Sequence, residues 1–324
     1  MVGNALIEYL RFSPKVCASI SMGGVTGGLL IAQASVLVRS GMCRNVLCVT
    51  GDNRLTGLND KVQDALAGVG HPQFEQPYGM SVPAAFAQAA QVYMHEFGLS
   101  ADHMAAVAVN QRANAARHPG AHMRSPITMD DVRASKMIAS PLRMLDCCLV
   151  SDGGSAVVVS AEDVVRDLSK PAVQNLGTGE GHTHEHVFMS PSLVDFGCKD
   201  SAAAALGQAG ISHKDIKSAH IYECFTSTVL ITLESMGFYD RGEAGAAALA
   251  GDFAIGGKFP VNTNGGLLSY GSSGAAGGMS HAVEAVRQLR GEAGDRQVAG
   301  ADLSFVHTLG GIFSGYCSIV LGCN

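Results

Sequence analysis

The sequence predicts an α/β protein in which strands and helices alternate along both halves of the chain. Three observations predict this fold class: short apolar runs closed by Gly, Asp or Pro, apolar helical stretches between them, and two Gly-rich loops that each lead directly into a helix. The 324 residues, 47% of them hydrophobic, suffice for two domains with buried cores. We expect the halves at residues 1–165 and 166–324, divided by a charged stretch before Pro171.

The first half is predicted to contain one helix after a glycine cluster and two strands. The cluster from Gly23 to Gly28 opens an apolar helix that runs to about Arg39. The continuous apolar run from Val46 to Thr50 is typical of a buried central strand, and Ala156 to Ser160 forms a second strand.

A loop-rich and helical insertion, residues 53–149, separates these two strands. One helix is predicted from Val82 to Phe97, where Gly98 ends it. Another begins after Ser100, which suits an N-cap position, and runs to about Ala116. Proline residues punctuate the remainder of the insertion, which is therefore expected to lie outside the sheet.

The second half shows the same alternation of strands and helices, although no residue-level repeat relates it to the first half. The predicted strands are Val173 to Leu176, Ser218 to Tyr222, Phe259 to Asn262, Leu303 to His307 and Cys317 to Leu321, and the predicted helices are Ser201 to Ala209, Thr226 to Met236 and Gly278 to Leu289.

Composition excludes several classes of partner. A net charge of -6 provides no basic face for nucleic acid. The nine cysteines show neither C-x-x-C pairs nor metal-ligand spacing, which favours reduced thiols and a cytoplasmic protein. No apolar stretch is long enough to span a membrane.

The two Gly-rich loops, around Gly24 and from Asn262 to Gly278, are the strongest indication of a functional site. Each precedes a helix, and helix N-termini stabilise negative charge. A single cluster of this kind would more simply allow a helix to pack closely on a strand. Two clusters in matching contexts favour one shared site.

Five ordered segments resemble the thiolase superfamily, and more closely its lipid-transfer or sterol-carrier-type branch. They are Val46 to Asp52, Ser151 to Ala156, Tyr222 to Thr226, Asn262 to Gly278 and His307 to Gly311. The resemblance covers nearly the whole chain. It implies two similar halves stacked as a five-layered αβαβα sandwich, a homodimer, and a site for a coenzyme A thioester that arrives as the substrate. No tightly bound cofactor and no metal are expected.

The departures from the family pattern concern the residues that carry its chemistry. The resemblance implies a nucleophilic Cys at the position of Gly24, and Cys17 lies too far upstream to replace it. Where the family has an activating His, a second Cys and an Asn or His that holds water, this chain has Ser272, Thr308 and Tyr222 respectively. Because the surrounding glycines are present, a changed reaction is a simpler explanation than a decayed enzyme.

A site without a thiol can still cleave a carbon–carbon bond beside a thioester, given a general acid or base and donors for the enolate oxygen. Tyr222, Tyr270 and His307 are the candidate acid–base residues. We expect backbone N–H groups at Gly24, Gly310 and Gly311 to receive the enolate charge. A tyrosine whose pKa were lowered by backbone donors could take the proton of a β-hydroxyl in a retro-aldol step. The chain is similar here to the thiolase-like aldolases of steroid side-chain degradation, which implies an OB-fold partner of the DUF35 type.

Other interpretations stay open at this point. The protein could be an acyltransferase that uses Thr26, Ser272 or a relocated Cys, or a non-catalytic carrier of acyl-CoA or lipid, or a scaffold subunit. Tyr222 could serve packing at a strand end, and His307 could be a core histidine.

Two further groups of polar residues have a functional and a structural interpretation. The alternating histidines His182, His184 and His186 could bind a metal, but the resemblance implies a loop beside the substrate. The insertion residues Arg112, Asn114, Arg117 and His118 could contact a phosphate, with a solvated helix face as the default.

Only Met1 to Ser21 precede the first glycine cluster, whereas the resemblance implies two strand–helix pairs there. We therefore expect an N-terminally shortened first half. Its sheet should expose apolar residues, and the chain should depend on a partner for stability.

Overall fold

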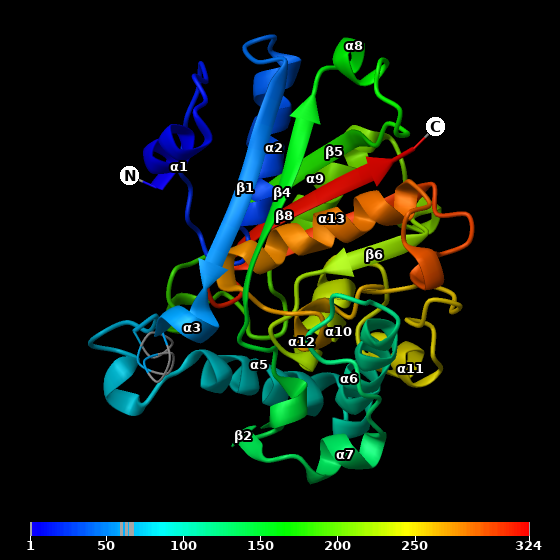
Figure 1. Ribbon diagram of the computed structural model, residues 1–324. Helices are drawn as coiled ribbons and strands as arrows, with labels where there is room; N and C mark the ends of the chain where they lie inside the picture. Colours follow the sequence, from blue (N-terminus) through cyan, green and yellow to red (C-terminus); the bar gives the residue numbers. More distant parts are fainter. Residues whose placement is uncertain (1, 59–60, 62–63, 65–67, 324) are drawn as a thin grey trace.

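The computed structural model describes residues 2–58, 61, 64 and 68–323, and shows an α/β protein with two main sheets (Figure 1). The first sheet pairs β1 (Asn45–Asn53) with β4 (Asp152–Ser160) in antiparallel register. The second has the order β5 (Gln174–His182), β8 (Gly315–Gly322), β7 (Leu303–Gly310), β6 (Ser218–Ile221). Only β6 and β7 are parallel.

Two helices, α2 (Thr26–Arg39) and α13 (Gly277–Leu289), form a layer between the two sheets. Both follow the predicted glycine clusters. A Cβ on Gly27 of α2 would lie only 2.5 Å from the backbone nitrogen of Met279 in α13, so the glycine allows the helix backbones to approach. Helix α9 (Lys199–Ala209) covers the other face of β5 and β8. The order sheet, helices, sheet, helix is that of a layered α/β sandwich.

The predicted helices of the insertion are confirmed as α5 (Val82–Phe97) and α6 (Ala101–Ala116). Ser81 caps α5 and Ser100 caps α6, each accepting a hydrogen bond from a backbone N–H of the first turn. Gly98 ends α5 with a φ of +72°. The ring of Phe86 in α5 lies 4.9 Å from that of Phe225. The insertion therefore shares a core with the second half, whose boundary at residues 165 and 166 stays a prediction.

The remaining elements connect these layers. They are α1 (Val2–Leu10), α3 (Arg54–Leu58), η2 (Gln76–Tyr78), α7 (Met129–Ala134), β2 (Met137–Ala139), β3 (Leu142–Arg143), η3 (Met144–Asp146), α8 (Glu162–Val165), η4 (Val187–Met189), η5 (His213–Asp215), α10 (Thr226–Ser235), α11 (Ala244–Leu249), α12 (Gly266–Ser269), η6 (Gly274–Ala276) and η7 (Gly294–Arg296). Within the residues that the structure describes, no helix has both the length and the apolar character to cross a bilayer.

The predicted strand from Phe259 to Asn262 is wrong. Only a single bridge joins Ala219 to Val261, because Asn262 adopts a φ of +51° and turns the chain away. The side chain of Asn262 replaces the backbone hydrogen bonds that a paired strand would make. It accepts a hydrogen bond from the backbone N–H of Ile221 and donates one to the carbonyl of Ile221.

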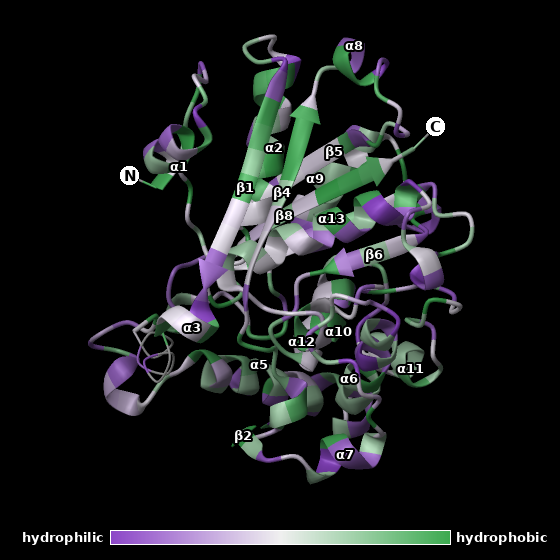
Figure 2. Ribbon diagram, viewed as in Figure 1, coloured by the Kyte–Doolittle hydropathy of each residue, from purple (hydrophilic) through white to green (hydrophobic). Residues whose placement is uncertain are grey.

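The prediction that residues 46–50 form a buried central strand is also wrong. β1 pairs only with β4, and alternate residues face solvent. Leu47, Val49 and Val158 are 43%, 39% and 62% exposed. Figure 2 shows the apolar character of both strands. The expected exposure of apolar residues on this sheet is therefore confirmed.

We predict that this face drives association of the protein. Leu47 and Val158 are paired across β1 and β4, so replacing both with Gln removes the centre of the apolar patch. Sedimentation velocity should show less concentration-dependent association for the double variant. Replacing the isolated exposed side chains of Leu168 and Leu249 with Gln is the matched control. Equal association of all three proteins would contradict the prediction.

Candidate active site

Three glycine-containing segments meet at the N-termini of α2 and α13. A Cβ on Gly278 would overlap with the carbonyl oxygen of Gly24. A Cβ on Gly23 would lie 3.4 Å from the nitrogen of Gly311 and 3.8 Å from the Cα of Gly310. The structure thus brings together the two Gly-rich loops and the end of β7, as one site requires.

The aromatic ring of Tyr222 occupies the space where a side chain at position 24 would begin. A Cβ on Gly24 would overlap with Cζ and Cε2 of Tyr222 and with the carbonyl oxygen of Leu309. Tyr222 follows β6, its side chain is buried, and its backbone N–H donates a 2.8 Å hydrogen bond to the carbonyl of His307. The phenol and a residue-24 nucleophile are therefore mutually exclusive in this arrangement.

A lowered pKa, the condition under which a tyrosine phenolate could act as the base, is not met at Tyr222. Burial raises this pKa well above its ordinary value, and the nearby Cys224, Cys148 and Glu223 oppose ionisation further, while Arg54 favours it. Tyr222 is therefore a neutral phenol near pH 7. It can donate a hydrogen bond or a proton, and it can accept a proton only if its own proton moves on.

Two thiols that the sequence did not single out as site residues, Cys148 and Cys224, flank Tyr222. The backbone N–H of Cys148 donates a 2.8 Å hydrogen bond to the carbonyl of Cys224. Burial raises the pKa of Cys148 to about 11 and that of Cys224 well above its ordinary value. Both are therefore protonated near pH 7 and are poor nucleophiles.

The hydroxyl groups of Thr26, an alternative nucleophile, and of Thr308, at a replaced family position, bind the backbone of the loops and strands around them. Thr26 donates to the carbonyl of Gly23 and accepts from the N–H of Met22, at 2.7 and 2.9 Å. Thr308 faces α2 and donates to the carbonyl of Cys317.

Ser272 belongs to a short polar row near the surface. Its backbone N–H donates to the hydroxyl of Ser151 at 3.3 Å, and its carbonyl accepts from the N–H of Ser151. The same hydroxyl contacts Nδ1 of the exposed His122 at 3.1 Å. A Ser–His contact therefore exists, but its serine is Ser151 rather than Ser272.

The structure does not bring the imidazole of His307 to the ring of Tyr222. Side chains alternate along β7, so Thr308 faces α2 while His307 faces α9. Nδ1 of His307 lies 2.9 Å from the hydroxyl of Ser318, and burial lowers the pKa of His307 to about 3. Its contribution near the site is the backbone carbonyl that binds the N–H of Tyr222.

Tyr270 ends α12 within the second Gly-rich loop and is partly exposed. Its ring packs edge-on against His118 with centroids 4.7 Å apart. Burial, together with Arg296, lowers the pKa of His118 to about 4, so this imidazole is neutral at pH 7.

The default of a solvated helix face is wrong for Arg112, Asn114 and His118, which are buried. Arg112 donates to the hydroxyl of Ser269, and Asn114 donates to the carbonyls of Val261 and Asn262. These contacts attach α6 to the second Gly-rich loop. Arg117 is exposed.

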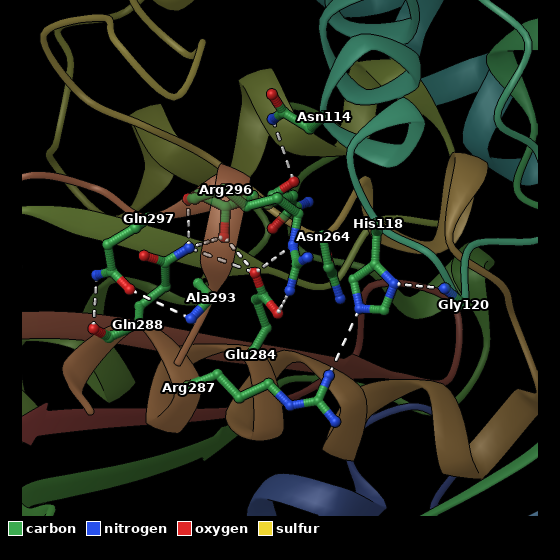
Figure 3. A network of polar contacts seen from close by, with 12 residues as sticks. Asn114, His118, Gly120, Asn264, Glu284, Arg287, Gln288, Ala293, Arg296 and Gln297 are labelled. Atoms are coloured by element: carbon green, nitrogen blue, oxygen red, sulfur yellow. Dashed lines mark hydrogen bonds and ion pairs between the residues drawn. The ribbon is translucent and has the colours of Figure 1, made fainter. Parts of the chain in front are cut away.

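A buried ion pair attaches the start of that loop to α13 (Figure 3). Glu284 accepts 3.1 Å hydrogen bonds from Nε and Nη2 of Arg296 and a 2.8 Å bond from the hydroxyl of Thr263. Gln288 donates to Thr263 and to the carbonyl of Arg296. Burial penalises the charge of Glu284, but the bonds from Arg296 lower its pKa overall. The loop geometry therefore depends on this network.

A second buried acid, Glu223, lies beside Tyr222 and 3.5 Å from His281 of α13. Both side chains are fully buried. Neither was flagged as functional from the sequence, although the adjacency of Glu223 to Tyr222 was a usable signal.

The histidines of residues 182–186 do not converge on one another. Nε2 of His184 contacts the carbonyl of Ile312, and His186 lies near Glu75. No group of three or more His, Cys, Asp or Glu side chains in the described ranges is arranged to hold a metal ion.

Comparisons with known proteins show consistent similarity. Residues 179–323 match the family model for a thiolase C-terminal domain-like region. An acetyl-CoA acetyltransferase of Methanothermobacter thermautotrophicus is 30% identical over 316 residues, covering 96% of this chain and 81% of that protein. A steroid side-chain-cleaving aldolase of Thermomonospora curvata is 33% identical over 303 residues, covering 89% of this chain and 75% of that protein. A solved structure described as the Ltp2-ChsH2(DUF35) aldolase superimposes with a TM-score of 0.82 at 31% identity, covering 93% and 78% of the two chains.

We predict that Gly24→Ala displaces Tyr222. The added methyl group overlaps with the ring and with a backbone carbonyl, so the free energy of unfolding should fall by about 1–3 kcal/mol. Gly207→Ala, where the added group meets open space in α9, should change it by about 1 kcal/mol or less. Urea denaturation measures both. An equally small effect at position 24 would contradict the packing described for Tyr222.

We predict that Arg296→Met lowers the free energy of unfolding by about 3–5 kcal/mol near neutral pH, because Glu284 would remain buried without its partner. Arg290→Met serves as the control, because it removes a guanidinium that follows α13 and donates to the carbonyl of Pro171 at the surface. Thermal or urea denaturation of both variants tests this. Similar losses would show that the buried pair has no special role.

Proposed function

Because this chain belongs to the thiolase superfamily, we propose that it is an enzyme that breaks a carbon–carbon bond of an acyl-CoA thioester without a covalent intermediate. The observation that supports this most directly is the ring of Tyr222 in the space of a residue-24 nucleophile. The aldolase similarities support the same reaction class.

The proposed reaction is a retro-aldol cleavage of a β-hydroxyacyl-CoA. The β-hydroxyl proton moves to the phenolic oxygen of Tyr222 as the phenolic proton passes to solvent. The bond between Cα and Cβ breaks, Cβ becomes a carbonyl carbon, and the electron pair forms the thioester enolate. A proton then returns to Cα, so the overall reaction consumes none. Its raised pKa suits Tyr222 to this exchange, because a neutral phenol both donates and accepts.

Backbone groups at the meeting point of the loops are the proposed stabilisers of the enolate. Gly24 lies two residues before the first residue of α2, Thr26, and the backbone of Gly310 and Gly311 packs against this turn. The first N–H groups of a helix lack intrahelical partners and attract negative charge. Fixed donors of this kind stabilise developing charge without reorganisation.

Tyr270 is the second proposed catalytic residue, since it lies on the second Gly-rich loop, which meets the Gly24 loop, and is partly exposed. His307 is left out because its imidazole faces α9.

The substrate class and assembly follow from the same similarities. Coenzyme A would arrive as part of the substrate, and the acyl group could be a steroid side chain, a branched fatty acid or an aromatic acid. A homodimer and an OB-fold partner of the DUF35 type are the proposed partners, the latter suggested by the description of the aldolase structure.

An acyltransferase that uses a relocated cysteine is the second candidate. Its support is the position of Cys148 beside Tyr222 and the similarity to an acetyl-CoA acetyltransferase. The raised pKa of Cys148 argues against it.

The test compares Tyr222→Phe with the double variant Cys148→Ala, Cys224→Ala. Purified protein, with and without a DUF35-type partner, is incubated with β-hydroxyacyl-CoA thioesters of different acyl groups, and the released acyl-CoA is measured by chromatography. Loss of the phenol should lower the rate by about 10²–10⁴-fold, whereas the double alanine variant should keep it. Site variants serve better than alkylating reagents, because adducts on thiols beside Tyr222 would block the site.

The opposite pattern, an active Phe variant and an inactive double alanine variant, would favour the acyltransferase. Binding of acyl-CoA without turnover, even with the partner present, would favour a carrier.

A further inference from the structure

A pocket of about 380 Å³ lies where the end of α6 meets the last turn of α13. Its lining includes Arg117, His118 and Pro119 after α6, Arg287 of α13, and residues 292–296. Arg287 comes nine residues after Gly278, which is about 13 Å along the helix at 1.5 Å per residue. The pocket is therefore distinct from the meeting point of the glycine loops.

His118 and Arg287 direct hydrogen-bond donors at each other (Figure 3). Nδ1 of His118 accepts a 3.0 Å hydrogen bond from the backbone N–H of Gly120, so the single proton of the neutral imidazole lies on Nε2. Nε2 lies 3.5 Å from Nη1 of Arg287, which is also a donor. Two donors cannot bond to each other, so both remain available to one shared acceptor.

Two guanidinium groups of the pocket have no acidic partner. Within the described part of the chain, Arg287 forms no ion pair, and the exposed side chain of Arg117 forms neither an ion pair nor a hydrogen bond. The pKa of Glu292 is lowered mainly by its hydrogen bond from Lys170, with Arg287 as a lesser cause. A cation is favourable in the last turn of a helix. That explains why Arg287 is basic, but not why it faces another donor.

The other charged groups of the lining are bound elsewhere, with one exception. Arg296 is paired with Glu284, and Glu292 accepts a 2.8 Å bond from Lys170. Asp295 is exposed and has no cation partner in the described ranges. The pocket thus presents two free positive charges, a neutral N–H donor and one carboxylate that accepts hydrogen bonds.

We propose that this pocket binds a phosphate group, either free or as a phosphomonoester. Its oxygens accept charge-assisted hydrogen bonds from Arg117 and Arg287 and a further bond from Nε2 of His118. Asp295 accepts the O–H group of a protonated phosphate oxygen. The volume leaves room for part of the molecule that carries the phosphate. This inference does not depend on the proposed function, because the proposed reaction uses none of these residues.

His118 connects the pocket to the second Gly-rich loop. Its ring packs edge-on against Tyr270 of that loop, with centroids 4.7 Å apart. A bound phosphate holds the imidazole in this orientation through Nε2. Because a ligand of the native state stabilises that state, occupation of the pocket stabilises the contact with the loop.

The test measures binding of inorganic phosphate to the purified protein by isothermal titration calorimetry, with sodium chloride keeping the ionic strength constant. Arg287→Met removes one of the two facing donors. Arg290→Met is the matched control, because its guanidinium follows the same helix but contacts the carbonyl of Pro171. Phosphate should bind about 10–100-fold more weakly to Arg287→Met, and the affinity of Arg290→Met should stay within about twofold of wild type.

A second measurement uses the wild type alone, in case Arg287→Met does not fold. In protein labelled with ¹⁵N-histidine, phosphate should shift the Nε2–H resonance of His118. The spectrum of His118→Gln identifies this resonance by its absence. Sulfate, which has no O–H group for Asp295, should bind about tenfold more weakly than phosphate near pH 8.

Competition identifies the source of the phosphate. Displacement of inorganic phosphate by coenzyme A, which carries a phosphomonoester, but not by dephospho-coenzyme A, which lacks it, assigns the group to the substrate. Displacement by neither assigns it to a separate phosphate compound. Both results support the site.

Two results overturn the proposal. Equal phosphate affinity of wild type, Arg287→Met and Arg290→Met contradicts the role of the facing donors, and so does an unchanged His118 resonance in saturating phosphate. Equal affinity for sulfate and phosphate contradicts the assignment to phosphate.

Discussion

The contact between the ring of Tyr222 and the backbone at Gly24 is the constraint on which the rest of the site depends. The N-terminus of α2, the second Gly-rich loop and the end of β7 converge there, and the ring fills the space left by an absent side chain. A helix N-terminus still offers donors to negative charge. What it no longer offers is room for a nucleophile. The chemistry therefore moves from the helix to the phenol.

Burial of that phenol determines what it can do. In water a tyrosine is already a weak acid, and a desolvated one is weaker, so Tyr222 acts as a proton carrier rather than as a phenolate. Next to Tyr222 in the chain, the buried acid Glu223 lies 3.5 Å from His281 of α13, the helix that the second Gly-rich loop opens.

Local signals in the sequence were sufficient for much of the fold. Ser100 and Gly98 mark helix ends because capping depends on residues adjacent in the chain. The glycine clusters were recognisable because close backbone approach admits no other residue. The strand predicted from Phe259 to Asn262 is absent because of a contact between distant segments. An apolar run does not reveal that the side chain of Asn262 replaces the backbone hydrogen bonds of a strand pair. Likewise, the apolar run of β1 does not reveal how many strands pair with it.

The candidate site was only partly predictable, since its properties arise from contacts between distant segments. The glycines and Tyr222 were found from the sequence, but the raised pKa of Tyr222 was not. The face of β7 on which His307 lies depends on register, and the burial of Arg112 depends on how α6 meets the loop. The central claim is that no acyl group is ever attached to the protein. The most direct test is mass spectrometry of the intact protein after acid quench of a reaction with acetyl-CoA or a longer acyl-CoA. The account predicts an unmodified mass. An added acyl mass, located by digestion to a peptide containing Cys148, Thr26 or Ser272, would contradict it.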